Sequence, residues 1–187
     1  MLKQFHQGIG NNVIEDPAKV YAELPGMPGL AVKQKKQGGK MPEPYVTPGT
    51  LASKTVDWLE KIEPFNQHAM KLNAEKSALL IVDMQKFFLD PGSPSFTCGG
   101  PAIIPVLAKL AEAFREQGRP VIYTRHVHHP DHLDSGIMGW WWEGMCIEGS
   151  PESEIHPDLA PQPGEKVVLK HRYSAFYNTD LETVLRV

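Results

Sequence analysis

The spacing of hydrophobic residues changes near Ser77, and this change divides the chain into two parts. Residues 1–50 show little periodic apolar pattern and are rich in Pro and Gly, which disfavour both helix and strand. In this first part, residues 56–62 have the spacing of a short helix. We therefore predict that residues 1–76 form an irregular N-terminal extension and that residues 77–187 form a folded domain.

Three short apolar runs in the second part have the length and composition of β-strands, and they are Ala78–Val82, Pro120–Thr124 and Lys166–Lys170. The first run is uninterrupted, as expected for a strand that is buried on both faces. A helix with one apolar face is predicted over 103–117, and another helix begins near Asp180. Strands that alternate with helices indicate an α/β fold, with a doubly wound parallel sheet in three layers.

Composition and charge match those of ordinary soluble globular proteins, with 41% hydrophobic and 22% charged residues. The formal net charge of −3 argues against partners bound by bulk electrostatics, such as nucleic acid or an anionic membrane. No apolar run is long enough to span a bilayer, and the first residues lack the apolar core of a secretory signal. Two cysteines are too few for a disulfide framework, so we expect a protein of the reducing cytoplasm.

Polar residues stand at the ends of all three predicted strands, and a parallel sheet brings these ends to one edge. Asp83 follows the first strand, Arg125 and His126 follow the second, and Lys170 ends the third. A carboxylate placed there can accept a proton from a nucleophile, and an ammonium group can stabilise an anion. Asp83 alone can also be read as a helix N-cap, but an Asp and a Lys at corresponding strand ends favour a catalytic pair.

Four motifs of the second part follow one another in a specific order. Residues 79–88 read LLIVDMQKFF and residues 170–176 read KHRYSAF, with Gly149–Pro151 and His156–Leu159 between them. In this order the motifs resemble those of the isochorismatase-like cysteine hydrolases. The resemblance covers about residues 77–187. It implies an isochorismatase-like, Rossmann-like α/β fold of which this chain holds the N-terminal half.

The resemblance also implies a mechanism. In this family a cysteine thiolate attacks an amide-like or related carbonyl, and backbone N–H groups near the cysteine bind the oxyanion. The aspartate, here Asp83, deprotonates the thiol and later activates water. The lysine, here Lys170, lies beside them and favours the charged states. Isochorismatase itself cleaves a vinyl ether without a thiol, so the family does not by itself define the reaction.

The cysteine of the family has no counterpart among the 187 residues. The resemblance places it at the end of a fourth strand, which would follow Val187, and neither Cys98 nor Cys146 matches that position. In the family's strand order, 3-2-1-4-5-6, the fourth strand pairs with the first, so its absence would leave Ala78–Val82 as a bare apolar edge. We therefore expect the chain to be a fragment or to need a partner that supplies the rest.

Further residues are candidate walls of a substrate pocket. Gln85 and Phe88 lie in the first motif beside Asp83, His126 ends the second strand, and Tyr173 follows Lys170. Three consecutive tryptophans, residues 140–142, cannot all face one core if the segment is extended; Trp142 is a candidate for the pocket, while packing over the sheet edge or a subunit contact are the alternatives. We predict a small-molecule substrate and a homo-oligomer.

The histidines raise the question of a metal. Nicotinamidase-type relatives hold a metal with an Asp, a His two residues later and a further His, and the matching positions here resemble His126, His128 and Met145. The first position therefore holds a histidine in place of an aspartate, and the last holds a methionine in place of a histidine. Two imidazoles on a loop can still bind a metal weakly. We nevertheless predict no cofactor and no tightly bound zinc or iron.

Three functions agree with these observations. The first is a cysteine hydrolase that cleaves a small amide, ureido or related C–N bond with Asp83 and Lys170. The second is a catalytically inactive relative that binds a ligand or forms oligomers. The third is a thiol-independent hydrolase of the isochorismatase type, in which Asp83 alone performs the acid–base chemistry.

Overall fold

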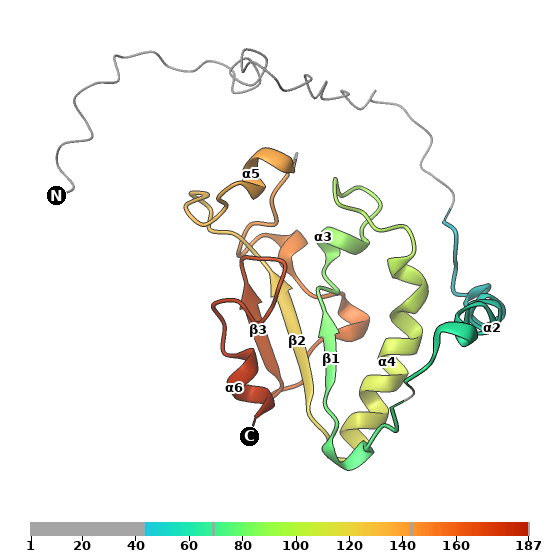
Figure 1. Cartoon of the computed structure of the whole chain (residues 1–187). Coiled ribbons are helices and arrows are strands. Elements are labelled where there is room, and N and C mark those ends of the chain that lie inside the picture. The colour runs from blue at the N-terminus through green and yellow to red at the C-terminus, as the bar shows by residue number, and fades with distance from the viewer. Residues whose placement is uncertain (1–43, 69, 143, 187) are drawn as a thin grey trace, which may run out of the picture. The chain divides into compact units, whose positions relative to one another are not determined.

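In the computed structural model, residues 44–68, 70–142 and 144–186 are described, so residues 1–43 of the predicted N-terminal extension lie outside the described residues. Three strands form one sheet: β1 (Leu79–Val82), β2 (Val121–His126) and β3 (Lys166–Lys170). They are parallel and lie in the order β1-β2-β3. Figure 1 shows that all three strands run in the same direction toward the end of the sheet where α3 and α5 lie.

Helices cover both faces of the sheet. Helix α4 (Gly100–Glu116) and the 3-10 helix η4 (Pro157–Leu159) pack on one face, and α6 (Leu181–Leu185) packs on the other. Alternation along β2 explains this division, because Tyr123 belongs to the core cluster under α4 and Ile122 to the cluster under α6. The predicted three-layer α/β arrangement with a parallel sheet is therefore confirmed.

Burial differs between β2 and β1. Every residue of β2 except Arg125 is buried, as the pattern of a central strand requires. In β1, by contrast, Val82 is 53% exposed, and among the described residues the strand has a neighbour on one side only. The prediction that this run is buried on both faces therefore fails at Val82, whereas Ile81 is buried; the edge position of β1 among the described residues agrees with the apolar edge expected from the sequence.

Helix α4 begins three residues before the predicted start, at Gly100, with Pro101 in its first turn, where a missing N–H leaves no hydrogen bond unmade. It ends at Glu116, one residue before the predicted end, and Gly118 follows with a φ of +62°, which glycine adopts without strain. Ile104 and Ala111 are buried on its apolar face, whereas Leu110 is 40% exposed.

The remaining elements are short and lie largely in segments that sequence patterns assign to loops. They are α3 (Lys86–Leu89), α5 (Met138–Trp141), η2 (Ala74–Lys76) and η3 (Pro151–Ser153). Single turns of helix have too few residues to create a periodic apolar pattern, so their absence from the sequence prediction is expected.

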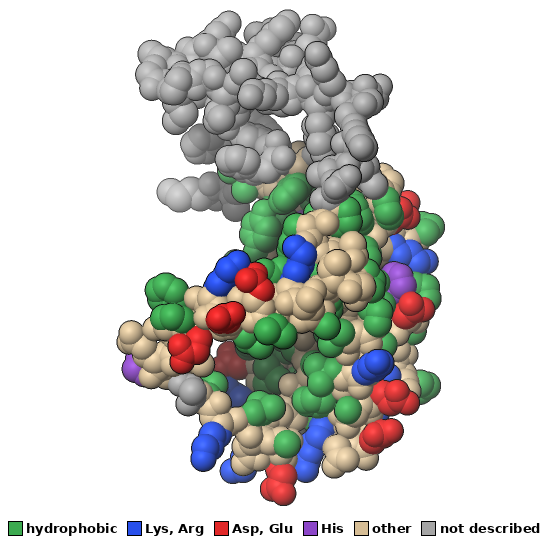
Figure 2. Space-filling model, turned by 90° about the vertical axis from the view of Figure 1, so that its right-hand side faces the viewer, with side chains coloured by type: hydrophobic (Ala, Val, Ile, Leu, Met, Phe, Trp, Pro, Cys, Tyr) green, Lys and Arg blue, Asp and Glu red, His purple; other side chains and the backbone are tan. Residues whose placement is uncertain are grey.

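Helix α2 (Leu51–Ile62) starts five residues before the predicted helix and is followed by the 3-10 helix η1 (Glu63–Phe65). It buries none of its residues. Figure 2, which views the molecule from the side of α2 and α4, shows hydrophobic side chains at the surface among charged ones. Among the described residues, no helix combines the length and hydropathy that crossing a membrane requires.

Candidate active site

The carboxylate of Asp83 and the ammonium group of Lys170 form an ion pair at the carboxyl ends of the strands. Lys170 Nζ lies 2.6 Å from Asp83 Oδ2, and the exposed fractions of the two side chains are 3% and 22%. Lys170 ends β3 and Asp83 follows β1, so the parallel register of three strands brings the two side chains together. A buried lysine needs such a partner, because an unpaired charge in this position would be strongly destabilising.

Asp83 is held by its backbone as well as by the lysine. Its φ of +51° lies in the left-handed region, which Asp tolerates better than most residues. The Thr124 hydroxyl donates to Asp83 Oδ1 over 2.6 Å and accepts from the Asp83 N–H over 3.1 Å. One carboxylate oxygen therefore binds Thr124 while the other faces Lys170, which gives the carboxylate a defined orientation.

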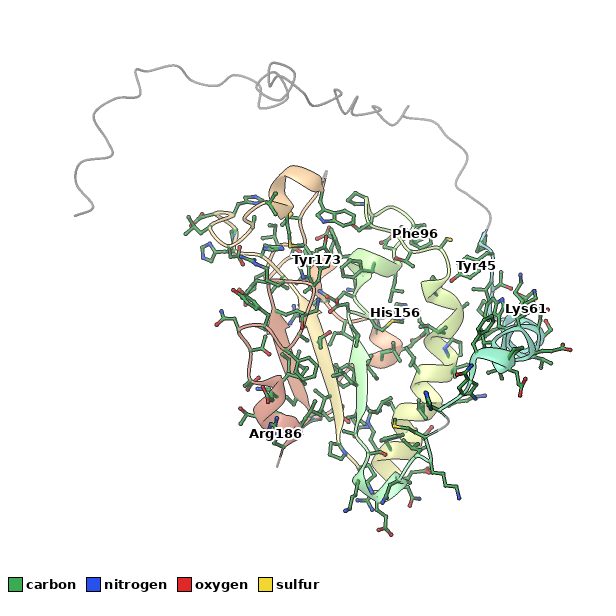
Figure 3. The ribbon with its side chains drawn as sticks, in the orientation of Figure 1. Tyr45, Lys61, Phe96, His156, Tyr173 and Arg186 are labelled. Atoms are coloured by element: carbon green, nitrogen blue, oxygen red, sulfur yellow. The ribbon has the colours of Figure 1, made fainter. Side chains whose placement is uncertain are left out.

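The pair borders a cavity of about 190 Å³. Its lining is rich in aromatic and sulfur-containing side chains and consists of Asp83, Phe87, Phe88, Ser95, His126, Met138, Trp142, Gly144, Met145, Cys146, Lys170 and Tyr173. Figure 3 shows Tyr173 at the end of the sheet opposite to Arg186, and the Trp142 indole N–H donates to the Tyr173 hydroxyl over 3.3 Å. The cavity thus joins a charged pair to apolar walls, as small-molecule sites commonly do.

Six of the seven predicted site residues line this cavity, and they are Asp83, Phe88, His126, Trp142, Lys170 and Tyr173. Gln85 does not. Its fully buried amide donates to the carbonyl oxygens of His126 and Ser153 over 3.0 and 2.9 Å, and its Oε1 accepts from the His126 N–H over 2.7 Å. These contacts join the end of β1 to the end of β2, so the described role of Gln85 is to link the two strand ends, and its substrate contact stays a prediction.

Arg125 is also turned away from the cavity. Its guanidinium donates from Nε to the Ser153 carbonyl and from Nη2 to the Ser153 hydroxyl, both over 3.0 Å. Of the polar residues at the end of β2, His126 alone lines the cavity.

His126 is a neutral imidazole at physiological pH. Burial, and next the positive charge of Lys170, lower the pKa of His126 to about 4. Its Nε2 lies 3.0 Å from Nε2 of His128, a side chain with no exposed surface. Burial also lowers the pKa of His128. Two neutral imidazoles are therefore joined through one proton.

Neither cysteine of the chain is placed as a thiolate beside Asp83 and Lys170. Cys146 lines the cavity, but burial raises the pKa of its thiol to about 11, so the thiol is protonated at neutral pH. Cys98 is partly exposed and lies outside the cavity lining.

Several site residues escape sequence analysis. Thr124 could have been identified, because it pairs in register with Val82, the residue before Asp83. Ser95 lies in an irregular segment and Met138 begins the single-turn helix α5, and neither segment has a periodic pattern that indicates which side chains face a pocket.

The residues at the positions used by metal-binding relatives do not fit a metal centre. The facing Nε2 atoms of His126 and His128 are hydrogen-bonded to each other, so neither presents a free lone pair there, and the third position is a methionine thioether. Among the described residues no three His, Cys, Asp or Glu side chains are grouped to hold a metal ion. The absence of a tight metal site stays a prediction.

Comparisons with known proteins agree with this fold. The family model of the isochorismatase domain matches residues 77–187. N-carbamoylsarcosine amidase of Arthrobacter sp is 36% identical over 117 residues, which are 59% of this chain and 44% of that protein. The phenazine biosynthesis protein PhzD of Pseudomonas fluorescens is 32% identical over 119 residues, which are 63% of this chain and 56% of that protein. This chain thus spans about half the length of the curated relatives it matches.

Among solved structures, a cysteine hydrolase from Pseudomonas syringae pv. phaseolicola 1448A superimposes with a TM-score of 0.60 and 35% sequence identity. The alignment covers 63% of this chain and 57% of that one. The family match includes all three strands and every residue that lines the cavity. The chain belongs to the isochorismatase family.

Proposed function

We propose that the protein is a hydrolase that cleaves a C–N bond of a small amide or ureido compound, with Asp83 as proton acceptor and Lys170 as its cationic partner. The observation that carries the proposal is the 2.6 Å contact between the two side chains at the border of the cavity. An N-carbamoylsarcosine amidase among the relatives supports the bond type, since a carbamoyl group on nitrogen is a ureido group.

The proposed reaction begins when Asp83 takes the proton of a cysteine thiol. The thiolate attacks the carbonyl carbon, and the C–N bond breaks as the leaving nitrogen receives that proton. Asp83 then removes a proton from water, which attacks the thioester formed from an amide or the thiocarbamate formed from a ureido compound; the acid leaves as the C–S bond breaks, and Asp83 returns the proton to the sulfur. Lys170 keeps positive charge beside the carboxylate throughout. The resemblance assigns the thiol to a further strand, outside the 187 residues.

A second candidate is thiol-independent hydrolysis of the isochorismatase type. It is supported by a relative described as a probable isochorismatase, from Pseudomonas chlororaphis, which is 30% identical over 119 residues. In that case Asp83 alone exchanges protons with the substrate. An inactive relative that only binds a ligand is the third alternative, and it predicts binding without turnover.

The experiment that tests the proposal is hydrolysis of N-carbamoylsarcosine and of simple primary amides by the natural full-length protein. We expect turnover that iodoacetamide abolishes and that Asp83→Asn lowers by at least about 100-fold. Asp158→Asn is the matched control, because its side chain is 70% exposed and lies outside the cavity lining. Turnover that survives alkylation supports the second candidate, and near-normal turnover by Asp83→Asn contradicts the assigned role.

The location, partners and oligomeric state of the protein form a second part of the proposal. We propose a cytoplasmic enzyme with a small-molecule substrate, without a nucleic-acid or membrane partner, whose hydrolase domain comprises residues 77–187. We further propose a homo-oligomer. Light scattering on the natural protein tests this last point, and a monomeric mass across the micromolar range contradicts it.

A further inference from the structure

One residue of the cavity wall, His126, has a ring nitrogen whose role as hydrogen-bond donor or acceptor depends on a second histidine outside the cavity lining. His126 lines the cavity and uses Nε2 to contact His128 Nε2 over 3.0 Å. Because both rings are neutral, only one of these two nitrogens carries a proton. The direction of this hydrogen bond decides whether the other ring nitrogen of His126, Nδ1, is a donor or an acceptor.

Asp134 determines the direction of the hydrogen bond between His126 and His128. Its Oδ1 lies 3.4 Å from His128 Nδ1 and accepts the backbone N–H of His129 over 3.0 Å. Among the described residues, His128 Nδ1 and Asp134 Oδ2 are the buried side-chain polar atoms that lack a hydrogen-bond partner. The separation of 3.4 Å is slightly longer than an ordinary hydrogen bond, and a small rotation of the carboxylate would close it.

The surroundings keep Asp134 in its acceptor form. His171 Nδ1 lies 2.9 Å from Asp134 Oδ2 but donates its hydrogen bond to the Val127 carbonyl oxygen over 2.7 Å, so Asp134 Oδ2 receives no proton from it. Burial would raise the pKa of Asp134, but the backbone hydrogen bond from His129 and the nearby imidazoles hold it below its usual value. An ionised carboxylate only accepts hydrogen bonds.

The opposite direction can be excluded on electrostatic grounds. If His128 carried its proton on Nε2, its Nδ1 lone pair would face the Asp134 carboxylate inside the protein, with no donor between them. Buried repulsion of this kind costs more than an ordinary hydrogen bond contributes. His128 therefore carries its proton on Nδ1, its Nε2 accepts, and His126 donates from Nε2.

We propose that Asp134 and His128 act as positioning residues that hold His126 as a hydrogen-bond acceptor, with an unprotonated Nδ1, in the wall of the cavity. His126 then selects substrates that present an N–H group to this wall, as the terminal NH₂ of a carbamoyl group does. The part of the proposal that concerns the substrate rests on the proposed function. The part that concerns the tautomers does not.

The test is a long-range ¹H–¹⁵N correlation spectrum of the histidine-labelled natural full-length protein at neutral pH. Ring signals of His126 and His128 are assigned by their loss in His126→Gln and His128→Gln. We expect the proton on Nε2 in His126 and on Nδ1 in His128. Protons on Nδ1 of His126 and Nε2 of His128 would overturn the proposal, whether or not the protein hydrolyses any amide.

Variants of Asp134 sharpen the test. Asp134→Ala removes the acceptor, so His126 should become a mixture of tautomers, whereas Asp134→Asn keeps a carbonyl oxygen and should retain the wild-type pattern. Asp131→Ala is the control, because the side chain of Asp131 is 72% exposed and faces His129. An unchanged His126 pattern in folded Asp134→Ala would contradict the proposal. If that variant does not fold, the wild-type spectrum still decides.

Activity gives a separate readout once a substrate is known. For N-carbamoylsarcosine we expect Asp134→Ala to raise KM several-fold with little change in kcat, since Asp134 touches neither substrate nor reacting atoms. Asp134→Asn should restore the wild-type KM. A fall in kcat alone would contradict the role in substrate selection, and it would leave the tautomer assignment to be judged by the spectrum.

Discussion

Two ion pairs lie at opposite ends of the same sheet, and they differ in how fully their hydrogen bonds are used. At the amino end, Arg115 donates to both carboxylate oxygens of Glu165 and also to the Tyr123 hydroxyl. Glu165 additionally accepts the Gln162 backbone N–H. At the carboxyl end, Lys170 contacts a single oxygen of Asp83, and both residues line a cavity.

This difference in hydrogen bonding distinguishes a structural ion pair from one that can take part in a reaction. Every strong acceptor of Glu165 is satisfied by the protein, and the hydrogen bond from Arg115 lowers the pKa of Glu165. Such a pair joins α4 to the start of β3 and has no capacity for a substrate. The pair of Asp83 and Lys170 retains unused acceptor and donor capacity toward an open space, which a reaction with a small molecule requires.

The largest expected effect is on turnover. Lys170→Met should lower kcat of the natural protein by about 100- to 1,000-fold, because it removes the charge beside the reacting groups. Arg115→Met, at the other end of the sheet, should leave kcat within about three-fold. Steady-state kinetics on both variants provide the check, and equal losses would show that the two pairs do not differ as described.

The next effect is on stability. Asp83→Asn leaves the ammonium of Lys170, a side chain that is 3% exposed, without its counterion. Breaking a buried pair in this way costs about 3–5 kcal/mol of the free energy of unfolding. Urea denaturation measures it. A loss below about 1 kcal/mol would mean that water reaches Lys170 and that the pair is not buried.

A pH effect of similar size follows from His126, whose pKa is lowered from 6.5 to about 4 by burial. Above pH 6.5 the ring is neutral in both the folded and the unfolded chain. As pH falls from 6.5 to 4, the His126 ring becomes protonated in the unfolded chain but stays neutral in the folded one. The free energy of unfolding therefore falls by about 3 kcal/mol. Urea denaturation at several pH values should show a flatter profile for His126→Gln than for the wild type, and equal slopes between pH 6.5 and 4 would contradict this account.

The smallest expected effect is on the free energy of unfolding when the ion pair of Arg115 and Glu165 is broken. Arg115→Met removes charged hydrogen bonds to Glu165, and the cost should be about 2 kcal/mol at neutral pH. Because the pKa of Glu165 is lowered, the contribution of this pair is present above pH 4.5 and is lost as pH falls further. Acid titration of Arg115→Met should therefore converge with that of the wild type, and a constant difference down to pH 2 would contradict this account.

Sequence analysis could predict the ion pair of the site because its geometry follows from simple rules. Each partner ends a short apolar run, and parallel strands bring such ends together. The burial of Val82 was predicted wrongly, because an apolar run does not indicate which of its side chains other segments cover. The position of Gln85 also depends on a distant residue, since its amide binds the Ser153 carbonyl in an irregular segment.

The contacts among His126, His128 and Asp134 could not be predicted from the sequence either. His126 and His128 are two residues apart in the sequence, but Asp134 lies beside His128 only because the loop of residues 129–134 folds back, and the Asp134 carboxylate accepts the His129 N–H. His128 is also held by a bridge to Ile147. No spacing rule predicts these contacts, because they depend on tertiary structure of a segment without regular elements.

The most direct test of the central claim is the double variant Asp83→Asn/Lys170→Met in the natural full-length protein. If the pair is retained for chemistry, removing both charges should restore most of the stability lost in Asp83→Asn, while turnover stays at least about 100-fold below wild type. Recovery of stability together with near-normal turnover would contradict the claim and make the pair a structural one, like Arg115 and Glu165.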